Sequence, residues 1–121
     1  MDPTALVDVA TRWLAAFNAR DLIALLALYE DDAVHVSPKL REQKPETRGE
    51  IRGKDQLRAW WAGAMSRLPG LRYEPEHLTA MGNRVFMEYL RKNPGDADLL
   101  VAEVLIVGKS GKIRASRVYH G

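Results

Sequence analysis

Apolar residues recur at helical spacing near the start of the chain. Asp2 and Pro3 are typical of a helix N-terminus, because the carboxylate can cap free amides and proline suits the first turn. The apolar stripe that follows runs from Leu6 to Phe17. Residues 18–20 break this pattern, so we expect the first helix to end there.

A second helix and a short strand are predicted next. Asp21 can cap the helix, and its buried face is expected to carry Leu22, Leu25, Leu26 and Tyr29. The acidic run 30–32 should end the helix, because the helix dipole disfavours anions at a C-terminus. Residues 33–38 then indicate a short strand that ends at a proline.

A charged connection and a third helix follow. Residues 39–52 contain a proline and a glycine and lack a periodic apolar signal. We interpret them as a solvated loop, with a mobile lid over a site as the alternative. Residues 53–68 predict a helix that ends at Pro69 and Gly70. Its apolar face carries Leu57, Trp60, Trp61, Ala64, Met65 and Leu68.

Every later segment has the pattern of a strand. Strands are predicted over 71–80, 84–92, 99–107 and 112–120, and short turn sequences separate them. Such short connections favour an antiparallel meander. The element order predicts an α+β fold in which three N-terminal helices pack in the concave face of a curved, mixed but mainly antiparallel β-sheet. This cone-like α+β barrel would leave a cavity suited to a small molecule.

One carboxylate, Glu103, interrupts the apolar strand 99–107. An ionised carboxylate in a covered strand is costly to desolvate unless it is paired or faces a wet cavity. Glu103 could line a pocket as an acid–base group with a raised pKa. It could instead form a buried ion pair with Arg91 or Arg117, or lie exposed in another register. We favour the pocket.

Composition narrows the class of protein. With 121 residues, 46% of them hydrophobic and 28% charged, the chain is expected to form one domain over 1–121. The net charge of +2 is small and basic residues alternate with acidic ones, so we expect no nucleic-acid partner. Cysteine is absent, which excludes disulfides and thiol chemistry.

The sequence also sets expectations about location and cofactors. No signal peptide and no membrane-spanning stretch is recognised, so we expect a cytoplasmic protein without a membrane partner. No motif implies a cofactor. His35, Asp31 and Asp32 do not form a convincing metal set, because the two carboxylates fit a solvated helix end, and so no metal is expected.

Several segments resemble the NTF2-like superfamily in its SnoaL-like branch. They are AFNARD at 16–21, LYEDDAV at 28–34, GKDQLRAWW at 53–61, and the final hairpin with GKI at 111–113 and RVY at 117–119. The resemblance covers nearly the whole chain and implies the α+β cone. It leaves the activity open, because the superfamily includes isomerases, cyclases, epoxide hydrolases, dehydratases and non-catalytic binding modules.

Ketosteroid isomerase shows what the resemblance implies for single residues. That enzyme uses a strand Asp as base, a helix Tyr, and a protonated Asp that donates to the developing oxyanion. The resemblance places these roles on Ser37, Trp13 and Glu103, respectively. Serine does not accept a proton near neutral pH without a base of its own, and an indole only donates. Only the role of Glu103 is therefore retained.

If Glu103 faces the cavity, strand alternation and the resemblance place a mostly apolar wall around it. The expected pocket-lining residues are Trp13, Phe17, Tyr29, Ser37, Trp60, Trp61, Met65, Met87, Tyr89, Val101, Leu105, Ser116 and Val118. The expected catalytic residues are Glu103 and its helpers His120, Arg91 and His35. Simple core packing is the alternative for the tryptophans and for His35, and a frayed chain end for His120.

Two hypotheses about function follow. The first is a SnoaL-like protein that binds a small cyclic or polyketide-like molecule in a hydrophobic pocket, with proton-transfer chemistry centred on Glu103. As an enzyme it would be a cofactor-independent isomerase, cyclase or hydrolase. The second is a non-catalytic ligand-binding or dimerisation module. In both cases we expect a homodimer through the outer sheet face, where Arg84, Glu88, Ile106, Arg114, Arg117 and Tyr119 should lie.

Overall fold

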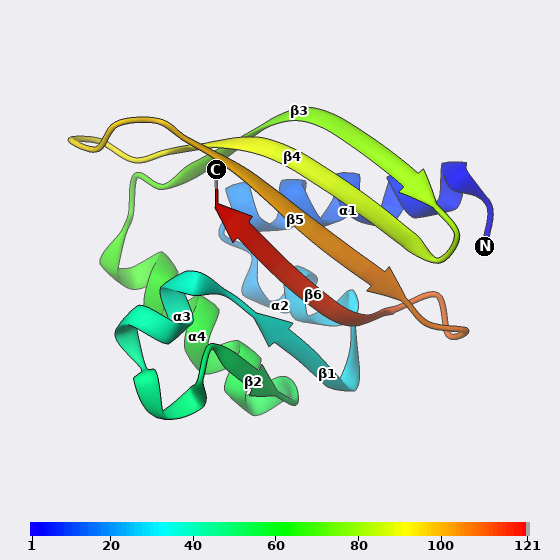
Figure 1. The fold of residues 1–121 in the computed structure, drawn as a ribbon, viewed down its shortest axis with the longest axis horizontal. Coiled ribbons are helices and arrows are strands. Elements are labelled where there is room, and N and C mark those ends of the chain that lie inside the picture. The colour runs from blue at the N-terminus through cyan, green and yellow to red at the C-terminus, as the bar shows by residue number, and fades with distance from the viewer. Residues whose placement is uncertain (121) are drawn as a thin grey trace.

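A computed structural model describes residues 1–120 of the chain. Its helices are α1 (Pro3–Asn18), α2 (Leu22–Ala27), α3 (Pro38–Gln43), the short 3-10 helix η1 (Pro45–Thr47) and α4 (Lys54–Arg67). Its strands are β1 (Tyr29–Val36), β2 (Glu50–Arg52), β3 (Arg72–Met81), β4 (Arg84–Lys92), β5 (Leu99–Val107) and β6 (Ile113–His120). The elements form a six-stranded sheet with helices packed against it (Figure 1).

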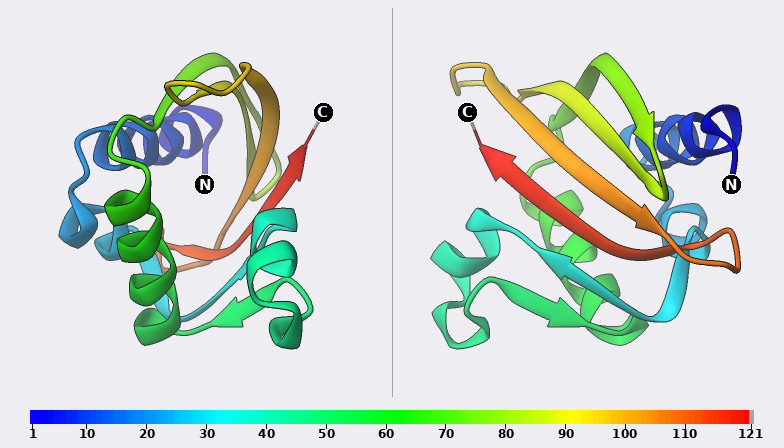
Figure 2. Two further views of the ribbon diagram at one scale, coloured as in Figure 1. Left: turned by 90° about the vertical axis from the view of Figure 1, so that its left-hand side faces the viewer. Right: turned by 45° about the vertical axis from the view of Figure 1, so that its right-hand side comes forward.

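The sheet has the strand order β2-β1-β6-β5-β4-β3. Strands β3 to β6 form the predicted antiparallel meander, β1 pairs with β6 in parallel, and β2 pairs with β1 in antiparallel fashion. The sheet curves, and α1 and α4 lie within its curvature (Figure 2). The predicted α+β class with a curved mixed sheet is therefore confirmed.

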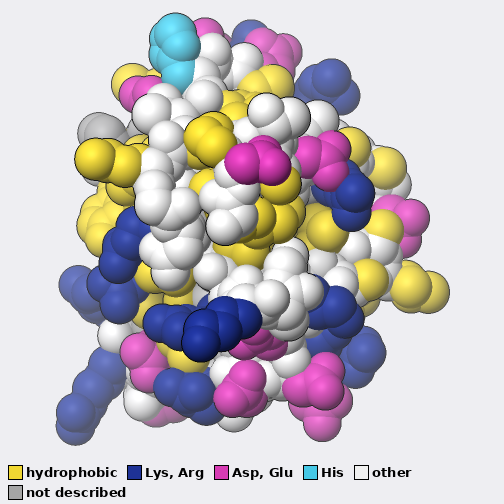
Figure 3. Space-filling model, turned by 90° about the vertical axis from the view of Figure 1, so that its right-hand side faces the viewer, with side chains coloured by type: hydrophobic (Ala, Val, Ile, Leu, Met, Phe, Trp, Pro, Cys, Tyr) yellow, Lys and Arg dark blue, Asp and Glu magenta, His cyan; other side chains and the backbone are white. Residues whose placement is uncertain are grey.

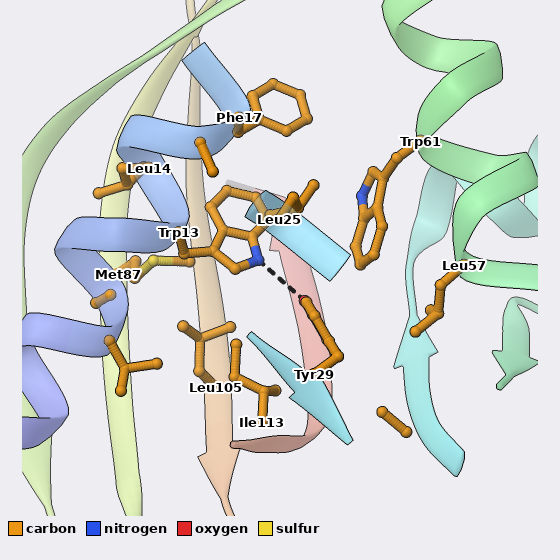
Figure 4. Close-up of a cluster of buried hydrophobic side chains, with 14 of the residues drawn as sticks. Trp13, Leu14, Phe17, Leu25, Tyr29, Leu57, Trp61, Met87, Leu105 and Ile113 are labelled. Atoms are coloured by element: carbon orange, nitrogen blue, oxygen red, sulfur yellow. Dashed lines mark hydrogen bonds between the residues drawn. The ribbon is translucent and has the colours of Figure 1, made fainter. Parts of the chain in front are cut away.

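The core lies between the sheet and the helices. Trp13 from α1, Leu25 from α2 and Leu57 from α4 meet Leu105 and Ile113 from the sheet in one buried cluster (Figure 4). Some of these residues belong to the helical apolar patterns of the sequence and the others to its strand patterns. The two patterns agree on one core because each element has a single buried apolar face.

The second helix is shorter than predicted. It ends at Ala27, and Tyr29 begins β1 instead of completing a helical face. The Tyr29 backbone pairs with Ile113 of β6, and its side chain is fully buried. The expectation for Tyr29 was wrong because Tyr29 is the first residue of a buried strand. It also lies four residues after Leu25, which is the spacing expected for two residues on one face of a helix.

The solvated loop predicted over 39–52 is also wrong, because the segment contains α3, η1 and β2. Ser37 caps α3 by accepting a hydrogen bond from the Lys39 amide at 3.2 Å, and Pro38 occupies the first turn. Only Leu40 is buried in α3, and only Ile51 in β2. One buried residue in each element gives no periodic apolar signal.

Asn18 ties the end of α1 to the edge strand β3. Its side-chain Nδ2 donates to the Tyr73 carbonyl at 2.7 Å, and its Oδ1 accepts from the Tyr73 amide at 2.8 Å. The side chain thus replaces a neighbouring strand for one residue of this edge. This contact fixes Tyr73, whose ring faces the interior.

Candidate functional site

A cavity of about 70 Å³ lies between the helices and the concave face of the sheet. Its more exposed lining residues come mainly from α3, the end of α4 and the end of β6, so the mouth of the cavity lies there. These elements are at the end of the molecule that faces the viewer in the left view of Figure 2. The other end of the molecule presents interspersed acidic and basic side chains (Figure 3).

Stacked aromatic rings form one wall of the cavity. Trp13 and Phe17 are one helical turn apart on α1, with ring centroids 5.4 Å apart and nearly parallel planes. Phe17 stacks on Tyr73 at 4.1 Å, and Tyr73 stacks on Tyr89 at 4.2 Å. Trp61 approaches from α4 on the other side of Tyr29 (Figure 4). These rings provide flat apolar surfaces for a planar ligand.

Glu103 lies in this aromatic surrounding and is 1% exposed. Its Oε1 accepts a hydrogen bond from the Tyr89 hydroxyl at 2.8 Å, and its buried Oε2 has no partner. Burial raises the pKa of the Glu103 carboxyl to about 8, although the Tyr89 hydrogen bond acts in the opposite direction. The carboxyl is therefore mostly protonated at neutral pH, with a proton to donate.

The two alternatives for Glu103 are wrong. Arg91 lies 3.8 Å from Asp96 instead of pairing with Glu103, and it is part of the cavity wall. Arg117 is exposed. It lies on the opposite face of β6 from Val118, the register partner of Glu103. No register exposes Glu103, since it pairs between Met87 and Val118 in the middle of the sheet.

His35 lines the cavity at the end of a buried hydrogen-bond relay. Trp13 Nε1 donates to the Tyr29 hydroxyl at 2.9 Å, and Tyr29 donates to Ser116 Oγ at 2.9 Å. Ser116 Oγ lies 2.6 Å from His35 Nδ1. Burial lowers the pKa of His35 to about 4, so the imidazole is neutral at physiological pH.

The mouth of the cavity is rich in cationic side chains. Lys39, Arg67 and Arg91 all line it, and Arg67 donates to Gln43 Oε1 at 2.9 Å. His120 lies beside them. Partial burial, followed by the charge of Lys39, lowers the pKa of His120 below its usual value. A neutral imidazole at this position can accept a proton.

The structure brings many of the predicted site residues together. The residues expected to be catalytic line the cavity, as do Trp13, Phe17, Ser37, Trp60, Trp61, Tyr89, Val101 and Val118. The remaining predicted lining residues, Tyr29, Met65, Met87, Leu105 and Ser116, do not. Met87 and Leu105 pack in the core beside Trp13 (Figure 4), Met65 is half-buried on α4, and Tyr29 and Ser116 belong to the relay.

Several lining residues were not predicted. They are Lys39, Gln43, Ala64, Arg67, Leu68, Leu71 and Tyr73. Lys39 and Gln43 come from the segment interpreted as a loop, where no apolar period marks them. Tyr73 could have been found, because strand alternation from Leu71 places it on the inner face.

Comparison with known proteins identifies the family. Residues 10–116 match the model of the SnoaL-like domain, so the chain belongs to the SnoaL-like family. A search of curated proteins finds no match. No helix within residues 1–120 is long and apolar enough to cross a membrane.

Solved structures share the fold over nearly the whole chain. A SnoaL-like protein of unknown function from Burkholderia thailandensis is 26% identical, with a TM-score of 0.89 and coverage of 100% of this chain and 98% of its own. A candidate ketosteroid isomerase from Kribbella flavida is 18% identical, with a TM-score of 0.79 and coverage of 99% and 80%. TerC, co-crystallised with polyporic acid, is 20% identical, with a TM-score of 0.82 and coverage of 97% and 92%.

Proposed function

We propose that the chain binds a small cyclic or polyketide-like molecule in the aromatic cavity and carries out proton transfer on it through Glu103. The observation that carries this proposal is the buried carboxyl of Glu103, which has no ion-pair partner and whose Oε2 has no hydrogen-bond partner within the described residues. A buried polar atom without a partner is unfavourable in a site that serves only the fold. A ligand oxygen that accepts a hydrogen bond from Oε2 would satisfy it.

The charge distribution supports a division of roles along the cavity. Protonated Glu103 supplies a proton, or a hydrogen bond, to an oxygen on which negative charge develops. Neutral His120 at the mouth is the base, and Arg91 stabilises an anionic group of the ligand. The protein supplies these groups without a cofactor.

The size of the cavity limits the ligand. The cavity is narrow, so a compact ring fits it more readily than a larger molecule, which requires the mouth to open. Lys39 and Arg67 at the mouth are not buried, so these long side chains can move aside for a larger molecule. TerC was co-crystallised with polyporic acid, which is one reason to include acidic compounds among the candidates.

The experiment combines ligand binding with turnover. A panel of cyclic ketones and hydroxyquinones is screened by thermal shift at pH 6, and each stabilising compound is incubated with the protein and followed by absorbance and mass spectrometry. We expect the Glu103→Gln variant to remain folded, with a melting temperature at or above that of the wild type, and to lose roughly 100-fold or more in turnover, because general acid–base groups contribute about this much. Glu76→Gln is the matched control, since Glu76 is exposed on the edge strand β3.

Two outcomes of this experiment would contradict the enzyme proposal. Unchanged turnover in Glu103→Gln would exclude proton transfer by this group. Stabilisation of the wild type without any turnover would favour the non-catalytic binding module.

One observation favours that second function, because Ser37, at the position of the isomerase base, uses its hydroxyl to cap α3.

We further propose that the outer face of the sheet forms a homodimer. Phe86, Leu100 and Tyr119 are 37%, 51% and 53% exposed and lie on the face opposite Glu103. Val104 and Ile106 lie on the same face of β5 and outside the main core cluster, but they are only 5% and 6% exposed. An exposed apolar patch of this kind is typical of an interface.

A charge placed on this patch tests the dimer. We expect light scattering after gel filtration to give a dimer for the wild type and a monomer for Leu100→Asp. Ile23→Asp on α2 is the control, because Ile23 is 84% exposed but lies away from the sheet face. A monomeric wild type, or a Leu100→Asp variant that remains dimeric, would refute this interface.

A further inference from the structure

The hydrogen-bond relay behind the cavity has a direction that its chemistry fixes. The indole Nε1 of Trp13 can only donate, so the Tyr29 oxygen accepts from it. Tyr29 has one hydroxyl proton, and Ser116 Oγ is the acceptor that lies within reach at 2.9 Å. Ser116 in turn has one proton, and His35 Nδ1 lies 2.6 Å away. Each donor then meets one acceptor.

The reverse direction leaves a buried proton without an acceptor. If His35 Nδ1 donated to Ser116, one of two protons would need another acceptor. Either Ser116 would donate to Tyr29 and leave the Tyr29 hydroxyl proton over, or Ser116 would accept from both neighbours and leave its own proton over. Tyr29 and Ser116 are both fully buried, and within residues 1–120 neither hydroxyl is within hydrogen-bond reach of a further acceptor. A buried hydroxyl without its hydrogen bond is destabilising. The stable arrangement is therefore the one in which Trp13 donates to Tyr29, Tyr29 donates to Ser116, and Ser116 donates to His35 Nδ1.

We propose that this relay locks His35 in the tautomer that carries its proton on Nε2, and that His35 is a ligand-positioning residue which donates a hydrogen bond from Nε2 into the cavity. The inference rests on the proposed binding function and specifies its ligand. Two donors, Glu103 Oε2 and His35 Nε2, then act from the cavity wall on acceptor oxygens of the bound molecule. His35 is not the base, because its free electron pair on Nδ1 is engaged by Ser116.

The arrangement around the ring supports a fixed donor. His35 is 2% exposed, its ring packs at 5.2 Å against Trp61, and its backbone pairs with Ile51 and Ser116 on the two sides of β1. Packing and the relay together hold the ring in one orientation. A donor held in place in this way loses little freedom on binding, which favours recognition of one oxygen position.

The tautomer can be measured without any ligand. Long-range nitrogen–proton NMR correlations at pH 7 distinguish a ring nitrogen that carries a proton from one that does not, and the His35 signals are assigned by their absence in His35→Phe. We expect wild-type His35 to show a protonated Nε2 and a bare Nδ1. We expect Ser116→Ala to show a mixture of both tautomers. A protonated Nδ1 in the wild type, or an unchanged tautomer in Ser116→Ala, would overturn the relay.

Ligand recognition is tested with a matched pair of probes, acetophenone and α-methylstyrene, in which a carbonyl oxygen is exchanged for a methylene group. We expect the wild type to bind acetophenone about 10-fold more tightly than its hydrocarbon counterpart, and His35→Phe to lose most of this preference. An unchanged preference in a folded His35→Phe variant would overturn the donor role. If neither probe binds the wild type, the proposed binding function and the donor role fail together, whereas the NMR result still decides the tautomer.

Discussion

The Glu103→Gln variant should be more stable than the wild type at alkaline pH and of similar stability at pH 5. The Glu103 carboxyl ionises near pH 4.5 in the unfolded chain and near pH 8 in the folded protein. Between these values the folded protein holds a proton that the unfolded chain has released. The free energy of unfolding of the wild type therefore falls as the pH rises through this window, and the loss is complete above pH 8.

The expected size of this effect is large for one residue. At about 1.4 kcal/mol for each pH unit between the two pKa values, ionising Glu103 destabilises the fold by about 5 kcal/mol. Whole domains are commonly stable by only about 5–15 kcal/mol. Glutamine keeps the shape of the side chain and cannot ionise, so the difference between the two proteins isolates the contribution of Glu103.

Urea denaturation at several pH values between 5 and 9 measures this difference. Glu76→Gln should follow the wild type throughout, because Glu76 is exposed on the edge strand β3. Wild-type and Glu103→Gln curves that remain parallel over the whole range would show that the carboxyl is already ionised in the folded protein at pH 5. That result would remove the proton on which the proposed function depends.

The titration of His35 changes the free energy of unfolding with pH in the opposite direction to that of Glu103. The folded pKa of about 4 lies below its usual value of 6.5, so the unfolded chain binds a proton first as the pH falls. The free energy of unfolding contributed by His35 rises with pH between these two values. Up to about pH 6.5, His35 raises the free energy of unfolding with pH while Glu103 lowers it. Above pH 6.5, only the decrease due to Glu103 continues.

The order and approximate bounds of most helices and strands could be predicted from the sequence, because most of these elements have one buried apolar face. Strands β4 and β5 have the predicted bounds, and α4 differs by one residue at each end. The inward direction of Glu103 follows from the same argument, since Val101 and Leu105 share its face. The segment that joins β1 to β2 could not be predicted in this way, because Leu40 and Ile51 are buried as single residues.

The relay shows a different limit of sequence analysis. Trp13, Tyr29, Ser116 and His35 come from α1, β1 and β6, and Ser116 is 87 positions away from Tyr29 in the chain. Ser116 and Tyr29 were expected to touch a ligand, and the structure places them behind His35 instead. Periodicity gives the face on which a side chain lies, but it does not give the depth at which that side chain sits.

Replacing Trp13 should have the largest effect on stability of any single side chain in the core. Trp13 is 1% exposed, stacks on Phe17 and donates to Tyr29, so it belongs both to the aromatic wall and to the relay. We expect Trp13→Ala to lower the free energy of unfolding by about 3–5 kcal/mol, as for other large buried aromatic residues. Urea denaturation at pH 6, where Glu103 is protonated, measures it.

Trp13→Phe separates packing from hydrogen bonding at the same position. Phenylalanine retains part of the stacking surface but has no N–H, so Tyr29 loses its donor. We expect this variant to lie between the wild type and Trp13→Ala, with a loss of about 1–3 kcal/mol that combines smaller volume with a hydroxyl oxygen left without its donor. A Trp13→Ala variant within 1 kcal/mol of the wild type would mean that the wall can collapse around the missing ring, and that the cavity does not depend on Trp13 for its shape.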